Sequence, residues 1–300
     1  MEYFCKKVSS EKCDLGEGLL WDSNRNLLLM TDIINGKLIE LDIDLEAQRS
    51  WLFNEQLAWI LPTTKNGIYL LGLESGIALC CIEKAQHIRW INKEFPGNKN
   101  CRLNDACVDS TGRVWLGSMN MESPTSIDGR LASFCEKNGL QIHDNGFTVT
   151  NGPVISPDEN FLFLNDTLKG IVYRYHLNKE LGKLSDRNIF IKFTPEQGYP
   201  DGMCFDNRGN LWVALGGGAA IMQIDSSGNI LRKISIPALN VTNLCFCGPN
   251  LDRLIVSTAS IGLTKQENVI YQDSGALFEI TNHHSMGLIT HSAKLDSTWT

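Results

Sequence analysis

Residues 106–117 read ACVDSTGRVWLG: an apolar segment, a short polar turn and a second apolar segment. Nearly the same arrangement returns at residues 203–214, which read MCFDNRGNLWVA. Short apolar runs that flank a turn of Asp, Asn, Ser and Gly are typical of β-hairpins. Four further copies keep the order of strand, turn and strand, at residues 19–32, 59–71, 153–164 and 244–257. The pattern therefore predicts a series of six similar hairpins.

The spacing of these hairpins is nearly regular along the chain. Successive turns are separated by roughly 41, 45, 47, 50 and 42 residues, counted between Asn26, Gly67, Gly112, Glu159, Gly209 and Leu251. A period of about 40–50 residues with several strands in each unit is typical of β-propeller blades. We therefore predict an all-β protein, a six-bladed β-propeller that forms a single domain over residues 1–300. A large β-sandwich is the alternative, but a sandwich would not repeat at a fixed period.

A ring of blades must also close on itself. We expect a strand at residues 3–8 to pair with the final blade, which forms near residues 270–295, so that both ends of the chain belong to one sheet. No stretch shows a sustained 3.6-residue periodicity, which argues against a mixed α/β fold.

The balance of charge narrows the classes of partner. The chain carries 27 Lys and Arg residues and 34 Asp and Glu residues, a formal net charge of −7. This balance argues against nucleic acid, because a phosphate-binding surface needs clustered positive charge. No basic run is dense enough to hold an anionic membrane, and no apolar stretch reaches the roughly 18 residues needed to span one. The first residues, MEYFCKK, contain no apolar signal-peptide core. We expect a cytoplasmic protein, monomeric or weakly homo-oligomeric.

Cysteine and histidine form no recognisable catalytic or metal motif. The ten cysteines include no Cys-x-x-Cys pair, and most lie in apolar runs, so we expect reduced structural thiols. The six histidines avoid the segments that lead into the innermost strands of the predicted blades. A Ser-His-Asp hydrolase or a histidine-ligated zinc site is therefore not expected.

Repeat proteins carry their function where the repeats differ, on the loops of one face. The segments just before the innermost strands are residues 16–18, 57–59, 104–106, 150–152, 200–202 and 241–243. Because these positions converge on the propeller axis, Glu17, Asn151 and Asp201 are expected to approach one point from three blades. Two carboxylates and one amide oxygen suit calcium, and also magnesium or manganese. Asp, Asn and Gly are ordinary turn residues too, so the pattern alone leaves a purely structural interpretation open.

Several of these segments together resemble the SMP-30/gluconolactonase/LRE-like family. They follow the family's order and spacing from about residue 13 to 280, and they read LGEGLLWD at 15–22, RLND at 102–105, GRVWLGSM at 112–119, NG at 151–152 and PDG at 200–202. The resemblance implies a six-bladed propeller with one divalent metal ion, held by Glu17, Asn151 and Asp201. It adds zinc to the candidate metals. It also implies contacts to a sugar, made by Arg102, Asn104 and Glu122.

The activity implied by the resemblance is the hydrolysis of a sugar lactone, a small-molecule substrate, to the aldonic acid. A divalent ion would polarise the lactone carbonyl, and Asp201 would act as the general base toward water. The chain departs from the family pattern at Leu19, Ala106 and Pro153, which bears on the shape of the pocket floor and on the substrate. Two alternatives stay open: a phosphotriesterase-like hydrolase, and a non-enzymatic propeller that binds calcium or a metabolite.

Overall fold

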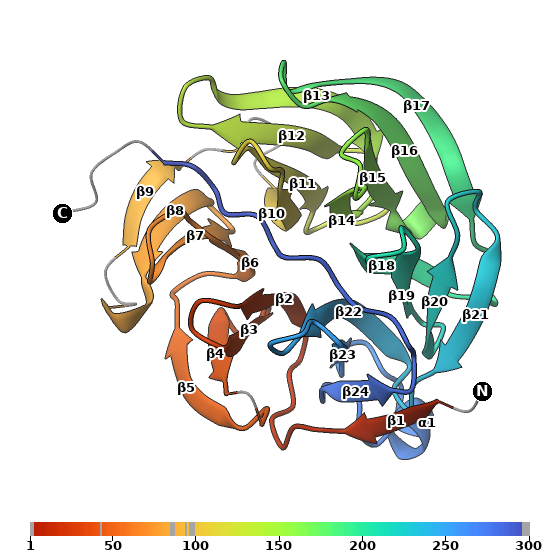
Figure 1. Cartoon of the computed structure of the whole chain (residues 1–300). Coiled ribbons are helices and arrows are strands. Elements are labelled where there is room, and N and C mark those ends of the chain that lie inside the picture. Colours follow the sequence, from red (N-terminus) through yellow and green to blue (C-terminus); the bar gives the residue numbers. More distant parts are fainter. Residues whose placement is uncertain (1–2, 43, 85–87, 94, 96–99, 296–300) are drawn as a thin grey trace.

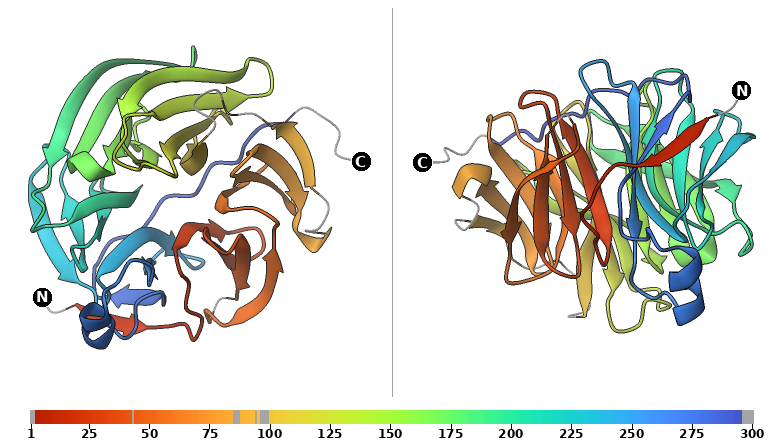
Figure 2. Two further views of the ribbon diagram at one scale, coloured as in Figure 1. Left: turned by 180° about the vertical axis from the view of Figure 1, so that it is seen from behind. Right: turned by 90° about the horizontal axis from the view of Figure 1, so that it is seen from below.

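Six four-stranded antiparallel sheets surround a common centre in the computed structural model (Figure 1). The structure describes residues 3–42, 44–84, 88–93, 95 and 100–295. Each sheet is one blade, and the innermost strands β2, β6, β10, β14, β18 and β22 lie nearest the centre (Figures 1 and 2). The prediction of a six-bladed β-propeller is confirmed.

Strands that are neighbours in the sequence are also neighbours in each of the first five blades. Blade one consists of β2 (Gly16–Asp22), β3 (Leu27–Asp32), β4 (Lys37–Leu41) and β5 (Ala47–Leu52). Blade two consists of β6 (Leu57–Pro62), β7 (Ile68–Leu73), β8 (Gly76–Cys81) and β9 (Ile88–Asn92). Blade three consists of β10 (Cys101–Val108), β11 (Val114–Asn120), β12 (Gly129–Cys135) and β13 (Gly139–Phe147).

The remaining blades complete the ring. Blade four consists of β14 (Thr150–Ile155), β15 (Phe161–Asp166), β16 (Ile171–Asn178) and β17 (Lys183–Lys192). Blade five consists of β18 (Tyr199–Phe205), β19 (Leu211–Gly216), β20 (Ala220–Ile224) and β21 (Ile230–Ser235). Blade six combines β22 (Asn240–Cys247), β23 (Arg253–Ala259) and β24 (Phe278–Thr281) with β1 (Phe4–Lys7). Two short 3-10 helices are η1 (Ile82–Lys84) and η2 (Thr167–Lys169).

The first and last strands of the chain meet in blade six. β1 pairs antiparallel with β24, with Phe4 opposite Thr281 and Lys7 opposite Phe278. This pairing covers the outer edge of β24 and joins the N-terminal segment to the last sheet, so the ring is closed by backbone hydrogen bonds as well as by packing.

The aspartate and tryptophan of the repeated unit explain why the hairpins are alike. Asp109 Oδ1 accepts a hydrogen bond from the turn amide of Thr111 at 2.9 Å, and its Oδ2 accepts one from Trp115 Nε1 at 2.8 Å. In blade five, Asp206 Oδ2 accepts from Trp212 Nε1 at 3.0 Å. Both indole rings are fully buried. The carboxylate therefore fixes the turn and the core side chain of the blade together.

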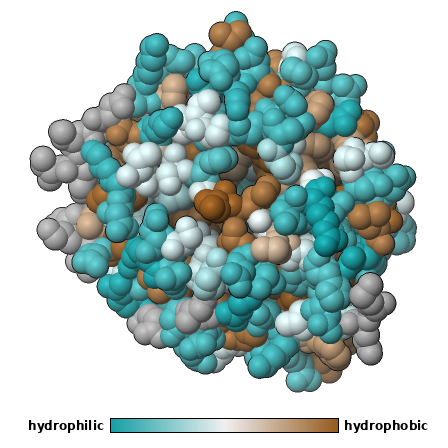
Figure 3. Space-filling view, viewed as in Figure 1, coloured by the Kyte–Doolittle hydropathy of each residue, from teal (hydrophilic) through white to brown (hydrophobic). Residues whose placement is uncertain are grey.

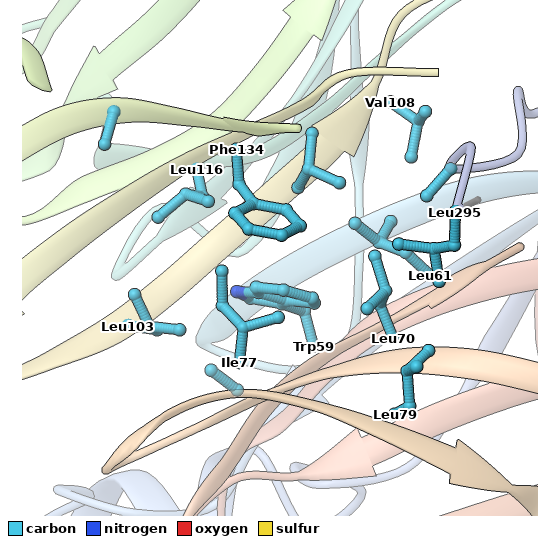
Figure 4. Packing of buried hydrophobic residues seen from close by; sticks show 14 of the residues in the cluster. Trp59, Leu61, Leu70, Ile77, Leu79, Leu103, Val108, Leu116, Phe134 and Leu295 are labelled. Carbon is cyan, nitrogen blue, oxygen red and sulfur yellow. The ribbon is translucent and has the colours of Figure 1, made fainter. Parts of the chain in front are cut away.

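Apolar side chains fill the space between neighbouring blades. Between blades two and three, Trp59, Leu103 and Phe134 belong to one buried cluster (Figure 4). Gly72 leaves room for the indole, because a Cβ at that position would lie 2.0 Å from Trp59 Cε2. This close packing holds the innermost strands in fixed positions around the central channel.

A short helix, α1 (Lys265–Ile270), precedes β24 and is not indicated by the hydrophobic periodicity. Glu267 N donates to Thr264 Oγ1 at 3.2 Å and Thr264 N donates to Glu267 Oε2 at 2.8 Å, which is a capping box. Six residues are too few to show a sustained helical pattern. Among the described residues, no helix is long and apolar enough to cross a membrane.

The segment after β24 crosses one face of the ring (Figure 1). We call residues 286–294 the strap. At one end of the strap, Gly287 N donates to Leu251 O at 2.7 Å; at the other, Lys294 N donates to Gly112 O at 3.1 Å. Leu251 and Gly112 lie in the turns that follow the innermost strands of blades six and three. The strap is therefore tied to turns of two separate blades and crosses the mouth of the channel.

Candidate functional site

Each innermost strand contains an irregularity close to its first residues, where its register against the second strand shifts. The six shifts lie at Glu17/Leu20, Leu57/Trp59, Leu103/Ala106, Asn151/Val154, Pro200/Met203 and Val241/Asn243. A β-bulge of this kind leaves a residue out of the ladder and re-aims its side chain. The sequence-based expectation places the candidate residues just before the strands, and this is wrong. They lie inside the strands, at or directly before the bulges: Glu17 is paired with Thr31 and Asn151 with Asn165, and Asp201 lies within the bulge of blade five.

The carboxyl groups of Glu17 in blade one and Asp201 in blade five come together at these bulges. Burial raises the pKa of Asp201 well above its ordinary value, and the nearby charges of Glu17 and Asp105 and a hydrogen bond to Glu17 add to the effect. Burial and the charge of Asp105 also raise the pKa of Glu17 to about 8. Two buried carboxyl groups in contact need a proton or a cation between them.

Asn151 reaches the same region from blade four. Its Nδ2 donates to Thr167 Oγ1 at 3.0 Å, and its Oδ1 accepts from Asn104 Nδ2 at 2.5 Å. A Cβ at the neighbouring Gly152, where φ is +51°, would lie 3.0 Å from the carbonyl oxygen of Asp201. Blades four and five are therefore in close contact here. The hydrogen bond to Thr167 Oγ1 orients the Asn151 amide, with its nitrogen toward Thr167.

The donor set of this cluster fits a divalent cation. Asp201 Oδ1 is buried and has no hydrogen-bond partner in the structure described, which is costly for a carboxylate oxygen. The three candidate ligands, Glu17, Asn151 and Asp201, offer only oxygen atoms, as calcium and magnesium prefer. In the part of the chain that the structure describes, no group of three His, Cys, Asp or Glu residues is arranged to hold a metal. The candidate set is not a group of that kind, because its third member, Asn151, is an amide.

Asp105 is a member of the cluster that the sequence reasoning did not assign. Its Oδ2 accepts from Gly152 N at 2.7 Å and its Oδ1 accepts from Ala106 N at 2.7 Å. Burial raises the pKa of Asp105 to about 6. Asp105 lies beside Asn104 in the bulge of blade three, and its place in the repeated segment at residues 104–106 is the signal that could have identified it.

Asn243 is the second residue that was not assigned. It lies at the bulge of blade six, and its Nδ2 donates to Glu17 Oε2 at 2.9 Å. Its Oδ1 accepts from Leu244 N at 2.7 Å, which fixes the orientation of the amide. Asn243 therefore positions the Glu17 carboxyl from the neighbouring blade.

Arg102 and Asn104 form a connected pair in β10, and both are buried. Arg102 Nη1 donates to Asn104 Oδ1 at 2.6 Å and to Leu103 O at 2.8 Å. Burial lowers the pKa of Arg102 to about 10, although the charges of Glu17, Glu74 and Asp201 oppose the shift. The arginine thus stays a cation on one side of the carboxyl cluster.

Glu122 stands apart from this pair. It follows β11, is exposed, and its Oε2 accepts from Asn100 Nδ2 at 2.5 Å. Its backbone amide donates to Asn120 Oδ1 at 3.0 Å. The structure therefore brings Arg102 and Asn104 into contact with each other, and it places Glu122 in a surface turn.

Comparisons with known proteins agree with the fold. The sequence profile of the SMP-30/Gluconolactonase/LRE-like region matches residues 15–260. Regucalcin of Danio rerio is 27% identical over 287 residues, which cover 95% of this chain and 96% of the relative. A Bacillus subtilis protein with the provisional name sugar lactone lactonase YvrE is 29% identical, over 88% of this chain and 90% of its own length. A solved structure from Agrobacterium tumefaciens, described as a calcium-binding protein, regucalcin, superposes with a TM-score of 0.91 at 20% identity, over 98% of both chains.

Proposed function

Because the chain belongs to the SMP-30/gluconolactonase/LRE-like family, we propose that it is a metal-dependent hydrolase that opens a sugar lactone to the aldonic acid. The observation that carries the proposal is the buried, unpartnered Oδ1 of Asp201 beside the Glu17 carboxyl. A cation at this point would satisfy both groups and would leave the cluster suited to a reaction that develops negative charge.

The metal of the proposal is one divalent ion held by Glu17, Asn151 and Asp201. Calcium is the first choice because every donor is an oxygen and because a relative is described as calcium-binding. Zinc, magnesium and manganese are the other choices. When bound, such an ion polarises a carbonyl group and stabilises an oxyanion.

Asp201 is proposed as the general base. Its carboxylate takes a proton from a water molecule while the water oxygen bonds to the carbonyl carbon of the lactone. The ring C–O bond then breaks, and the proton passes to the leaving ring oxygen. The product is an open-chain hydroxy acid, and Asp201 returns to its initial state.

Arg102, Asn104 and Glu122 are proposed to position the sugar. Arg102 carries more N–H donors than its hydrogen bonds to Leu103 O and Asn104 Oδ1 use, so it can also donate to a substrate hydroxyl. Asn104 is held by Arg102 and by Thr150 O, to which its Nδ2 donates at 2.8 Å. Glu122 would act from the surface turn, as an acceptor for hydroxyl groups at the entrance.

A panel of aldonolactones tests the proposal. Hydrolysis is followed by acid release, before and after treatment with EDTA and after addition of calcium, zinc, magnesium or manganese. We expect activity that EDTA abolishes and one of the ions restores. Turnover of a phosphotriester such as paraoxon, but of no lactone, would replace the proposal with a phosphotriesterase. Calcium binding without turnover of either substrate class would replace it with a binding protein.

A further inference from the structure

We call Glu17, Asn151 and Asp201 the metal-site cluster. Beyond these residues, the central channel continues as a cavity of about 650 Å³. One end of this cavity is formed by Gly18, Asp105, Gly152 and Asn243, each at or next to a bulge of the site. The other end is formed by strap residues 287–291. The hydrogen bond from Gly152 N to Asp105 Oδ2 at 2.7 Å ties two of the bulges together at the first end. The cavity therefore lies behind the site and under the strap.

The wall of this cavity is largely apolar. Six lining residues occupy equivalent positions in the innermost strands, five or six positions before the turn residue of each blade: Leu20, Leu61, Cys107, Val154, Cys204 and Cys245. The six residues that directly precede them in the sequence also line the cavity, and all are apolar. Free thiols behave as small apolar groups. Two successive rings of the wall thus offer water few hydrogen-bond partners.

Polar groups gather at the end of the cavity that the strap closes. Ser156, Glu159, Thr290 and His291 line it there, and His291 Nε2 lies 3.7 Å from Glu159 Oε1. Among the described lining residues, none is Lys or Arg. An anionic ligand would therefore face carboxylates without a matching permanent cation. An uncharged ligand suits this lining better.

We propose that the half of the channel between the metal-site cluster and the strap is a second binding site, for an uncharged aliphatic molecule with a hydroxyl-type polar end. The hydrocarbon part lies against the two apolar rings, and the polar end lies beside Ser156, Thr290 and His291. A ligand of this class makes van der Waals contacts along the apolar lining. The volume lies within the range of small-molecule pockets, roughly 300–1,000 Å³.

The strap controls entry to this site. Leu288 and Ile289 are exposed although they lie over the cavity, and apolar surface gathers at the centre of this face (Figure 3). Gly287 packs so closely that a Cβ there would lie 2.2 Å from Phe246 Cβ. A ligand enters when the strap moves between its two anchors. Gly287→Ala, which loosens one anchor, is expected to speed both association and dissociation.

Straight-chain alcohols test the proposal directly. Calorimetric titration of the full chain with 1-hexanol, 1-octanol and 1-decanol, in EDTA, is expected to show one saturable site. The affinity should rise about fourfold for each added methylene until the cavity is full. Decanoate should bind at least about tenfold more weakly than 1-decanol, because its charge meets no lysine or arginine. Equal binding of decanoate would overturn the assigned ligand class, and absence of saturable alcohol binding would overturn the site.

A pair of variants in blade four locates the binding. Val154→Trp fills the cavity from β14 and is expected to weaken 1-decanol binding more than about tenfold. Ile189→Trp places the same side chain on β17, at an exposed position on the outer edge of that blade, and should leave binding unchanged. Equal effects of the two variants, or no effect of Val154→Trp, would reject the location. If Val154→Trp does not fold, Cys245→Met is used instead. This substitution fills a smaller part of the cavity from β22 and should also weaken 1-decanol binding.

The binding test is independent of the proposed lactonase activity. It is carried out without metal and without a lactone, so its failure leaves the hydrolase proposal intact. Conversely, a protein without lactonase activity should still bind 1-decanol.

Discussion

The two ends of the central channel are built by the same six strands but differ in chemistry. At the first end, the bulges place Glu17, Asp105 and Asp201 in a buried group of carboxyls, where their pKa values are raised. A few residues further along the same strands, the wall consists of apolar side chains and thiols such as Val154 and Cys204. The comparison shows that, within the channel, the buried carboxyls lie at or beside the interruptions of strand pairing.

The reason lies in the geometry of the strands. In a regular ladder, side chains alternate between the two faces of a blade, and both faces pack against neighbouring blades. A charged side chain there is buried and needs a partner, as Glu40 of β4 has in Arg25 and Arg49. A bulge releases one side chain from this alternation, so polar groups from several blades can meet at the channel. The following experiments test this contrast.

The largest effect is expected from Asp201→Asn. The amide keeps an oxygen at the position but cannot take a proton from water, so kcat should fall by about 10²–10⁴-fold. The fold should persist, because blade five is held by apolar packing around it. Steady-state kinetics on an aldonolactone and thermal unfolding by circular dichroism check both parts.

Asp186→Asn is the matched control for this variant. Asp186 is exposed in blade four and has a φ of +54°, a conformation that Asn also tolerates. It should retain full activity. If Asp201→Asn were as active as this control, Asp201 would not be the base.

Arg102→Ala should have a smaller and substrate-dependent effect. Loss of a charged donor to a sugar hydroxyl is expected to lower kcat/KM for a polyhydroxylated lactone by about 10- to 100-fold. A plain aliphatic lactone has no such hydroxyl, so its kcat/KM should change by less than about threefold. Equal losses on both substrates would assign Arg102 to supporting Asn104 and the fold instead.

The pH dependence of stability tests the carboxyl end without turnover. In the metal-free protein, the pKa of Glu17 is raised from 4.5 to about 8, so the folded state binds more protons than the unfolded state between these values. Stability should therefore fall as the pH rises from about 4.5 to about 8. Added calcium should reduce this slope, because a cation replaces the proton. Chemical unfolding at several pH values, in EDTA and in calcium, measures the slope.

Glu17→Gln sharpens the same test. In EDTA at pH 8, the neutral amide should make the protein more stable than the parent chain, by about 1–3 kcal/mol, because no charge is buried. In calcium the order should reverse, because a ligand has been lost. Glu180→Gln, an exposed change in blade four, should leave both measurements unaltered. A less stable Glu17→Gln protein in EDTA would contradict the buried-charge account.

The smallest effect is expected at the strap. Gly287→Ala should lower the free energy of unfolding by about 1–2 kcal/mol, because the added Cβ meets Phe246. It should leave kcat unchanged, since the strap lies at the other end of the channel from the carboxyls. Leu288→Ala, in the same strap but exposed, should change stability by less than about 0.5 kcal/mol. A loss of kcat in Gly287→Ala would mean that the two ends are coupled.

Much of the architecture can be predicted from the sequence. The hairpins recur at a nearly fixed spacing because each blade must bury the same faces against its neighbours, and this alone determines a six-bladed ring. The same periodicity identifies Glu17, Asn151 and Asp201 as residues at one phase of the repeat. Their roles as metal ligands remain a prediction.

Other features depend on contacts between blades that no local pattern records. The bulges are hidden because the apolar alternation resumes after them. Asp105 and Asn243 act on Gly152 and Glu17 of neighbouring blades, so their own segments do not reveal their partners. Glu122 follows a strand closely in the sequence, yet the turn directs it to Asn100 and the surface.

What the amino-acid sequence determined by itself is the fold, because repeated short-range patterns of strand and turn are sufficient to specify blades and their number. The chemistry inside the channel depends instead on contacts between blades. Burial inside the ring raises the pKa of Asp201, and the charges of Glu17 and Asp105 from other blades raise it further. The strap closes a cavity only because its ends bind turns far away in the chain. Both effects require residues from different blades to lie close together, and the closure of the ring brings them together.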